Sequence, residues 1–156
     1  MASRRDQIKL SEEELRELLE AERVVVVSSN GLRGWPHSMP MWYVPRDGEL
    51  WVWTYAKSQK VRNLERDNRT TLLVETGVEY QELRGVMIES EAVIHRDPEV
   101  ILQFGKDLTV RYTEGIESIE GDAAAAMQAQ AAKRVAISFP PTRVATWDHR
   151  KLGGTY

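Results

Sequence analysis

Apolar and polar positions alternate along much of the chain, which predicts a protein built mainly of β-strands. The plainest case is the segment ELWVWTY, residues 49–55, where large aromatic side chains occupy every second position and therefore share one face. Shorter apolar or alternating runs predict further strands over 24–27, 36–44, 70–76, 82–94 and 135–139, and a last short one over 143–147.

Helix start signals predict four helices between these strands. Each is preceded by a serine or an aspartate, side chains that cap the first turn of a helix. One of these starts carries a glutamate three residues after its serine, a capping box, and another has proline at its first helical position. The helices are expected over 11–22, over 58–67, after Asp97 and after Asp122.

Short connections between the strands favour an antiparallel arrangement. Arg46-Asp47-Gly48 is a hairpin turn signal, and parallel strands would need longer crossovers than most of these connections provide. Six or so short strands punctuated by glycine and proline indicate a small barrel. We therefore interpret residues 1–156 as one domain, mainly β with peripheral helices, with a core over 11–147 and a polar tail over 148–156.

Composition narrows the possible functions. The chain of 156 residues has a net charge of −3 with both signs mixed, so a nucleic-acid partner is not expected. It has no cysteine, which excludes thiol catalysis, cysteine-ligated zinc and disulfides and fits a cytoplasmic protein. No apolar run approaches the ~20 residues that span a bilayer, so no membrane partner is expected. The three histidines are scattered, and no metal site is predicted.

The junction between strand 49–55 and the following helix is the strongest candidate site. Lys57, Ser58 and Lys60 lie at the expected helix N-terminus, where unpaired backbone N–H groups and the helix dipole favour an anion. The hydroxyl of Thr54 could point to the same end of the strand. This pattern predicts a cradle for a phosphate-bearing cofactor, although a capped surface helix with solvated lysines would give the same spacing.

A second candidate lies in the proline-interrupted strand from Ser38 to Met41. Proline cannot donate to a strand ladder, so this strand is expected to be irregular or to lie at a sheet edge, with backbone groups free for the edge of a flat heterocycle. A β-bulge would explain the same sequence. Four of the five tryptophans lie between residues 30 and 75, where they either fill a core or wall a flat ligand.

Several motifs in this central stretch also point to a known family. They are a Gly-Trp-Pro segment before a proline-containing strand, an Asp-Gly turn, an aromatic strand and the segment KSQKVRNLERDNRTTLLVE. Together they resemble the pyridoxamine-phosphate-oxidase-like split-barrel flavoproteins. KVRNLERDNR followed by YQELRGVMIE is similar to the deazaflavin-using branch, the flavin/deazaflavin oxidoreductases, and the resemblance covers residues 11–147.

The resemblance implies a six-stranded antiparallel split β-barrel of the FMN-binding type with flanking helices. It also implies a homodimer with two cofactor sites at the subunit interface. By position, the basic junction would hold the cofactor phosphate, the end of the aromatic strand would line the ring and ribityl chain, and the proline-containing strand would meet the ring edge. The residues so implied are Ser38, Met39, Pro40, Met41, Trp53, Thr54, Tyr55, Ala56, Lys57, Ser58 and Lys60, with Gly85 and Trp147 from the second subunit.

The sequence departs from the pyridoxamine-phosphate oxidases themselves. Gly85 stands where those enzymes carry a glutamine that meets the flavin, Ser58 replaces an arginine, and their arginine-bearing C-terminal substrate motif is missing. Vitamin B6 oxidation is therefore not expected. The resemblance implies an F420H2-dependent reductase that passes a hydride to a small organic acceptor, with no catalytic side chain identified. The alternatives are an FMN flavoprotein of the same fold and a non-enzymatic cofactor- or haem-binding protein, in which His37 is the candidate axial ligand.

Overall fold

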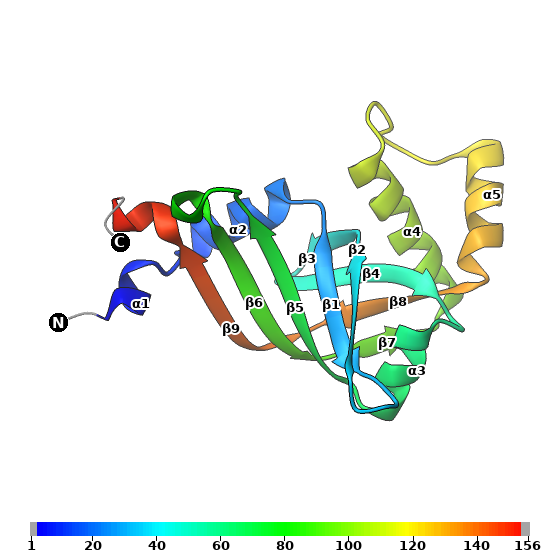
Figure 1. Ribbon diagram of the computed structural model, residues 1–156. Coiled ribbons are helices and arrows are strands. Elements are labelled where there is room, and N and C mark those ends of the chain that lie inside the picture. The colour runs from blue at the N-terminus through cyan, green and yellow to red at the C-terminus, as the bar shows by residue number, and fades with distance from the viewer. Residues whose placement is uncertain (1–2, 154–156) are drawn as a thin grey trace.

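Nine strands form two antiparallel sheets in the computed structural model, which describes residues 3–153 (Figure 1). A five-stranded sheet has the order β2-β1-β5-β6-β9, and a four-stranded sheet has the order β3-β4-β8-β7. The strands are β1 (Val25–Asn30), β2 (Pro36–Met41), β3 (Tyr43–Arg46), β4 (Glu49–Tyr55), β5 (Arg69–Thr76), β6 (Arg84–Glu91), β7 (Val93–His95), β8 (Arg134–Phe139) and β9 (Pro141–Asp148).

The helices lie around the two sheets rather than between them (Figure 1). They are α1 (Arg4–Gln7), α2 (Glu12–Ala21), α3 (Gln59–Arg66), α4 (Pro98–Tyr112) and α5 (Gly121–Ala131), with short 3-10 turns at η1 (Tyr80–Glu82) and η2 (His149–Leu152). The α4–α5 pair stands at one side of the molecule, and the described N-terminal residues lie near η2 at the other (Figure 1). Within residues 3–153, no helix combines the length and the apolar content that crossing a bilayer requires.

The core lies between the facing surfaces of the two sheets. Alternate residues of β1, β5 and β6 are buried on the inner face of the five-stranded sheet, as the period of a strand dictates. Leu50 and Val52 on β4 and Ile137 and Phe139 on β8 cover the opposite face. Leu18 of α2 is also buried against this cluster.

The prediction of a mainly-β antiparallel fold with flanking helices is confirmed, but the expected count of six strands is wrong. The segments expected as single strands over 36–44 and 82–94 each break once, at Trp42 and Ala92. At each break the chain leaves the five-stranded sheet and enters the four-stranded one, which is how strands make the corners of packed sheets. The residues on both sides of each corner form an unbroken apolar run, 39–44 at the first and 92–94 at the second, so the sequence pattern does not mark the corners. The two sheets are not one closed barrel.

Most of the predicted boundaries hold. Strand β4 has the predicted bounds, and β2 lies at a sheet edge as its prolines require. The turn between β3 and β4 places both Asp47 and Gly48 at positive φ, 51° and 80°, the geometry that an Asp-Gly hairpin favours. Helix α5 instead begins one residue before Asp122, with Glu120 at the N-cap position.

Candidate functional site

The candidate cradle forms where β4 passes into α3. Ser58 occupies the N-cap position with extended backbone angles, but its side chain makes no capping hydrogen bond. A helix whose N-cap side chain does not cap it leaves its first N–H groups for another acceptor. Thr54, which is buried, and Lys60 complete this end of the helix, since Lys60 Nζ donates to Thr54 Oγ1 at 3.1 Å.

Lys60 lies partly buried in this arrangement. Loss of hydration on burial lowers the pKa of its amine below the ordinary value, because a charged ammonium is less favourable where water is excluded. No carboxylate within residues 3–153 forms an ion pair with it. An anion bound here would therefore restore a favourable partner for the charge.

A cavity of about 410 Å³ opens beside the cradle. Segments far apart in the sequence surround it: the edge strand β2, the aromatic strand β4, α3, the helical pair α4–α5 and the start of β8. Its lining includes two cations and no carboxylate among the residues that the structure describes. The lining residues are Met39, Pro40, Met41, Trp42, Trp53, Lys60, Leu108, Thr109, Thr113, Gln130 and Arg134.

Five of the residues proposed from the sequence thus meet in one cavity. Met39, Pro40 and Met41 come from the sheet edge, Trp53 from β4 and Lys60 from α3. Ser38 lies on the same edge strand, on the face opposite to Met39 and Met41, where its hydroxyl is 2.8 Å from the hydroxyl of Ser28.

The remaining residues of the junction surround this cavity rather than line it. Thr54 is buried behind Lys60, and Ser58 caps α3 by position only. Tyr55 is exposed and stacks on an arginine, and Ala56 packs partly buried against the core. Lys57 is exposed before the helix and does not line the cavity. The two lysines that the sequence treated alike therefore have different surroundings.

Gly85 and Trp147 lie away from this cavity within one chain. They are directly opposite each other on β6 and β9, at the far side of the five-stranded sheet from β2. A Cβ added at Gly85 would lie 2.6 Å from Trp147 Cζ2 and 2.7 Å from the carbonyl oxygen of Val74. Glycine therefore fits this position because the indole and the neighbouring backbone both come too close for any side chain.

The sequence did not identify the wall formed by α4, α5 and β8. Arg134 is the principal omission: its guanidinium carbon is 4.4 Å from the ring centroid of Trp53 and 4.2 Å from that of Tyr55. It reaches these rings because β8 pairs with β4, placing Arg134 opposite Tyr55 across 79 positions of sequence. No local pattern signals such a pairing.

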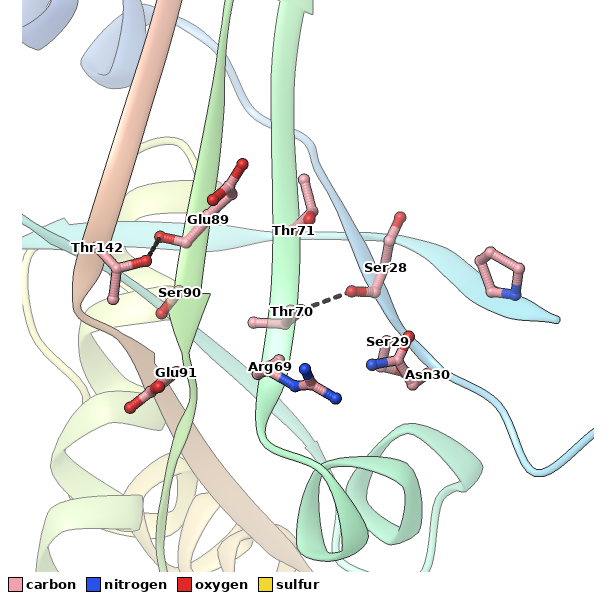
Figure 2. A pocket seen from close by; sticks show the side chains of 11 residues that line it. Ser28, Ser29, Asn30, Arg69, Thr70, Thr71, Glu89, Ser90, Glu91 and Thr142 are labelled. Carbon is pink, nitrogen blue, oxygen red and sulfur yellow. Dashed lines mark hydrogen bonds between the residues drawn. The ribbon is translucent and has the colours of Figure 1, made fainter. Parts of the chain in front are cut away.

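A second recess of about 560 Å³ lies on the outer face of the five-stranded sheet (Figure 2). Its lining is largely hydroxyl and charged groups, including Glu89 and Glu91, from strands that run side by side. Two hydrogen bonds in Figure 2 join neighbouring strands: Thr70 donates to the carbonyl of Ser28, and Thr142 donates to that of Glu89. This recess is lined by carboxylates as well as by an arginine, so it is a weaker candidate for an anionic cofactor than the cavity beside Lys60.

No cluster of histidine, cysteine, aspartate or glutamate within residues 3–153 could hold a metal ion. His37 lies on β2 with its Nδ1 atom buried and without a hydrogen-bond partner in the described part of the chain.

The fold consists of two packed antiparallel sheets, and comparison with known proteins identifies its family. The family model for pyridoxamine 5'-phosphate oxidase matches residues 11–148, so the chain belongs to this family. No curated protein matches the chain.

Solved structures extend this comparison. A conserved hypothetical protein, Rv2991, from Mycobacterium tuberculosis is 36% identical, with a TM-score of 0.88, over 99% of this chain and 95% of that one. An F420 reductase is 22% identical, with a TM-score of 0.66, over 86% and 98% of the two chains. HutZ, the heme storage protein of Vibrio cholerae, is 14% identical, also with a TM-score of 0.66, over 88% and 96%. The last two likenesses show a shared fold.

Proposed function

We propose that the protein is an F420H2-dependent reductase that transfers a hydride to a small organic acceptor. Three features that meet around one cavity carry the proposal: an uncapped helix N-terminus, a partly buried lysine that forms no ion pair with the described residues 3–153, and a flat indole. A cofactor with an anionic group and a flat ring system satisfies all three features. A solved F420 reductase shares this fold.

The residues fit such a cofactor in a simple division of roles. The N-terminus of α3 and Lys60 would hold the phosphate, and Trp53 and the edge of β2 would line the ring. The reduced deazaflavin, when bound, supplies a hydride, and a proton from water completes the two-electron reduction of the acceptor. The protein contributes position, exclusion of water and compensating charge rather than a reacting side chain.

We further propose that the active form is a homodimer with two cofactor sites at the subunit interface. Gly85 and Trp147 are separated from the cavity of their own chain by the width of the five-stranded sheet. If they close a cofactor site, that site is in a second copy.

The test is a fluorescence titration of the purified protein with F420 and, side by side, with FMN. We expect Lys60→Ala to weaken F420 binding by about 1–3 kcal/mol, the range for a charge-assisted phosphate contact. Lys57→Ala, which also removes one charge, should weaken it less, because Lys57 is exposed and its field is screened. F420 affinity should also fall as the pH rises through the lowered pKa of Lys60, since only the protonated amine attracts the phosphate.

Other outcomes would select the alternatives. Unchanged F420 affinity in Lys60→Ala would show that the phosphate is not held in this cradle. A protein that purifies yellow and binds FMN but ignores F420 would be an FMN flavoprotein of the same fold. Haem binding that depends on His37, without turnover of any acceptor by reduced cofactor, would favour a storage or carrier role.

A further inference from the structure

Arg134 is a cation that the protein holds in place against two aromatic rings. Its guanidinium carbon lies 4.4 Å from the ring centroid of Trp53 and 4.2 Å from that of Tyr55, distances at which cation–π attraction is effective. No carboxylate within residues 3–153 forms an ion pair with Arg134, and its Nε atom is buried without a hydrogen-bond partner there. An arginine oriented in this way loses little side-chain freedom when it binds an anion.

The cavity offers two separate cations for anionic ligands. Lys60 enters from α3 on one side and Arg134 enters from β8, next to the α4–α5 pair, on another. The proposed function assigns the cofactor phosphate to Lys60 and the N-terminus of α3. The guanidinium of Arg134 is then left to face the remainder of the cavity, where the acceptor must lie to receive a hydride.

We propose that Arg134 determines substrate specificity by binding a planar anionic group, a carboxylate in the simplest case, on the acceptor. This inference rests on the proposed function, because it takes the acceptor to share the cavity with a cofactor held at Lys60. A guanidinium presents parallel N–H donors that match the two oxygens of a carboxylate, a pairing that a lysine ammonium does not reproduce.

The other residues that line the cavity indicate the shape and polarity of the rest of such an acceptor. Leu108 of α4 offers apolar surface, while Thr109 is already engaged as a donor to the carbonyl of Gly105 at 2.9 Å. A flat apolar body that ends in a carboxylate fits this lining. An α,β-unsaturated aromatic acid has that form and also contains an activated double bond.

The test uses cinnamate and cinnamamide, which have the same shape but differ in charge, in calorimetric titrations of the cofactor-free protein. We expect the parent to bind cinnamate about tenfold or more tightly than cinnamamide, the ratio that one charge-assisted contact provides. Arg134→Met keeps an apolar stem against the two rings and should reduce the ratio to within about twofold. Arg134→Lys should retain an intermediate preference because it keeps the charge but not the fork.

Two matched variants separate this role from general effects. Arg5→Met removes one positive charge from α1, at the far side of the molecule, and should leave the ratio unchanged (Figure 1). Lys60→Met should lower F420 affinity but keep the preference for cinnamate. Thermal unfolding of each variant checks that it is folded. If Arg134→Met does not fold, Arg134→Lys still provides the test.

The outcomes are decisive in either direction. No preference for cinnamate in the parent, or the same preference in Arg134→Met, would overturn the proposal. The proposal would also be overturned if Lys60→Met lost the preference for cinnamate while Arg134→Met kept it. The same holds if Arg134→Met lost affinity for F420 but not for cinnamate. A parent that prefers cinnamate through Arg134 but binds no F420 would retain the arginine's anion site and reject only the proposed cofactor.

Discussion

At the scale of single residues, Asp148 shows how a buried charge is accommodated. Its side chain is 2% exposed, and the guanidinium of Arg150 donates to both carboxylate oxygens. These hydrogen bonds, together with one from the backbone N–H of Arg150, hold the pKa of Asp148 below its ordinary value. The backbone N–H of Asp148 also donates to Ile8, so this residue ties the end of β9 to the N-terminal segment.

The lowered pKa of Asp148 predicts a pH-dependent contribution to stability. A carboxyl group whose folded pKa is depressed stabilises the fold above its unfolded pKa, about 3.9, and loses that contribution as the pH falls through the folded pKa. Asp148→Asn should therefore lower the free energy of unfolding by about 1–3 kcal/mol at pH 7. The difference should shrink below about pH 4, as measured by urea denaturation across pH.

The exposed pair formed by Arg143 and Glu89 provides the control. Its charged atoms are 3.3 Å apart, but both side chains are largely open to water. Glu89→Gln should change the free energy of unfolding by less than about 0.5 kcal/mol at either pH, as exposed ion pairs usually do. A cost at Glu89 equal to that at Asp148 would contradict the assignment of the effect to burial.

At the scale of elements, two helix starts use their N-cap residues differently. The Asp97 side chain accepts hydrogen bonds from the backbone N–H groups of Glu99 and Val100 at 2.8 and 3.3 Å, whereas the Ser58 side chain accepts none from the backbone at the start of α3. The first cap serves stability, and the second leaves its helix end open. Because the two caps are short polar side chains in the same local conformation, replacing each by alanine separates these roles.

We expect one variant to lose stability and the other to lose affinity for the cofactor. Asp97→Ala should lower the free energy of unfolding by about 1 kcal/mol, and Ser58→Ala should lower it by no more than a few tenths. Ser58→Ala should instead weaken binding of F420, because the Ser58 hydroxyl lies at the helix end that we propose holds the phosphate. Equal losses of stability, measured by chemical denaturation, would show that Ser58 caps α3 in solution.

Local signals explain how much of this architecture could be predicted from the sequence. Strand β4 and the starts of α3 and α4 were correct because alternation and capping depend on residues within a few positions. The corners at Trp42 and Ala92 were missed because each lies in an unbroken apolar run that reads as part of one strand. Trp53 and Lys60 could be grouped in one candidate site because they are close in sequence, whereas the contact of Arg134 with Trp53 depends on which distant strands pair.

At the scale of the whole molecule, the outer face of the five-stranded sheet carries a continuous apolar row. The register aligns Pro40, Val26, Leu73, Met87 and Ala145 across all five strands, on the face opposite the core. These side chains are exposed or only partly buried, and no helix crosses in front of this face in Figure 1. An apolar row of this kind is typical of a surface that a second subunit covers.

We therefore expect the protein to sediment as a dimer, and Leu73→Glu to convert it to a monomer. A charge in the centre of the row would be buried without a partner, which is strongly unfavourable. Val93→Glu, an exposed strand position on the other sheet, should leave the dimer intact. Analytical ultracentrifugation distinguishes these cases, and a parent that sediments as a monomer would exclude the interface.

The long excursion through α4 and α5 leaves from β7 and returns to β8, two strands that pair directly. The length of this excursion can therefore change without shifting the register of either sheet, because β7 and β8 pair with each other directly. Proteins that share this fold could therefore differ in the length of this excursion while both sheets stay the same. For the same reason, the α4–α5 excursion is a practical segment to replace when the binding selectivity of the protein is to be changed.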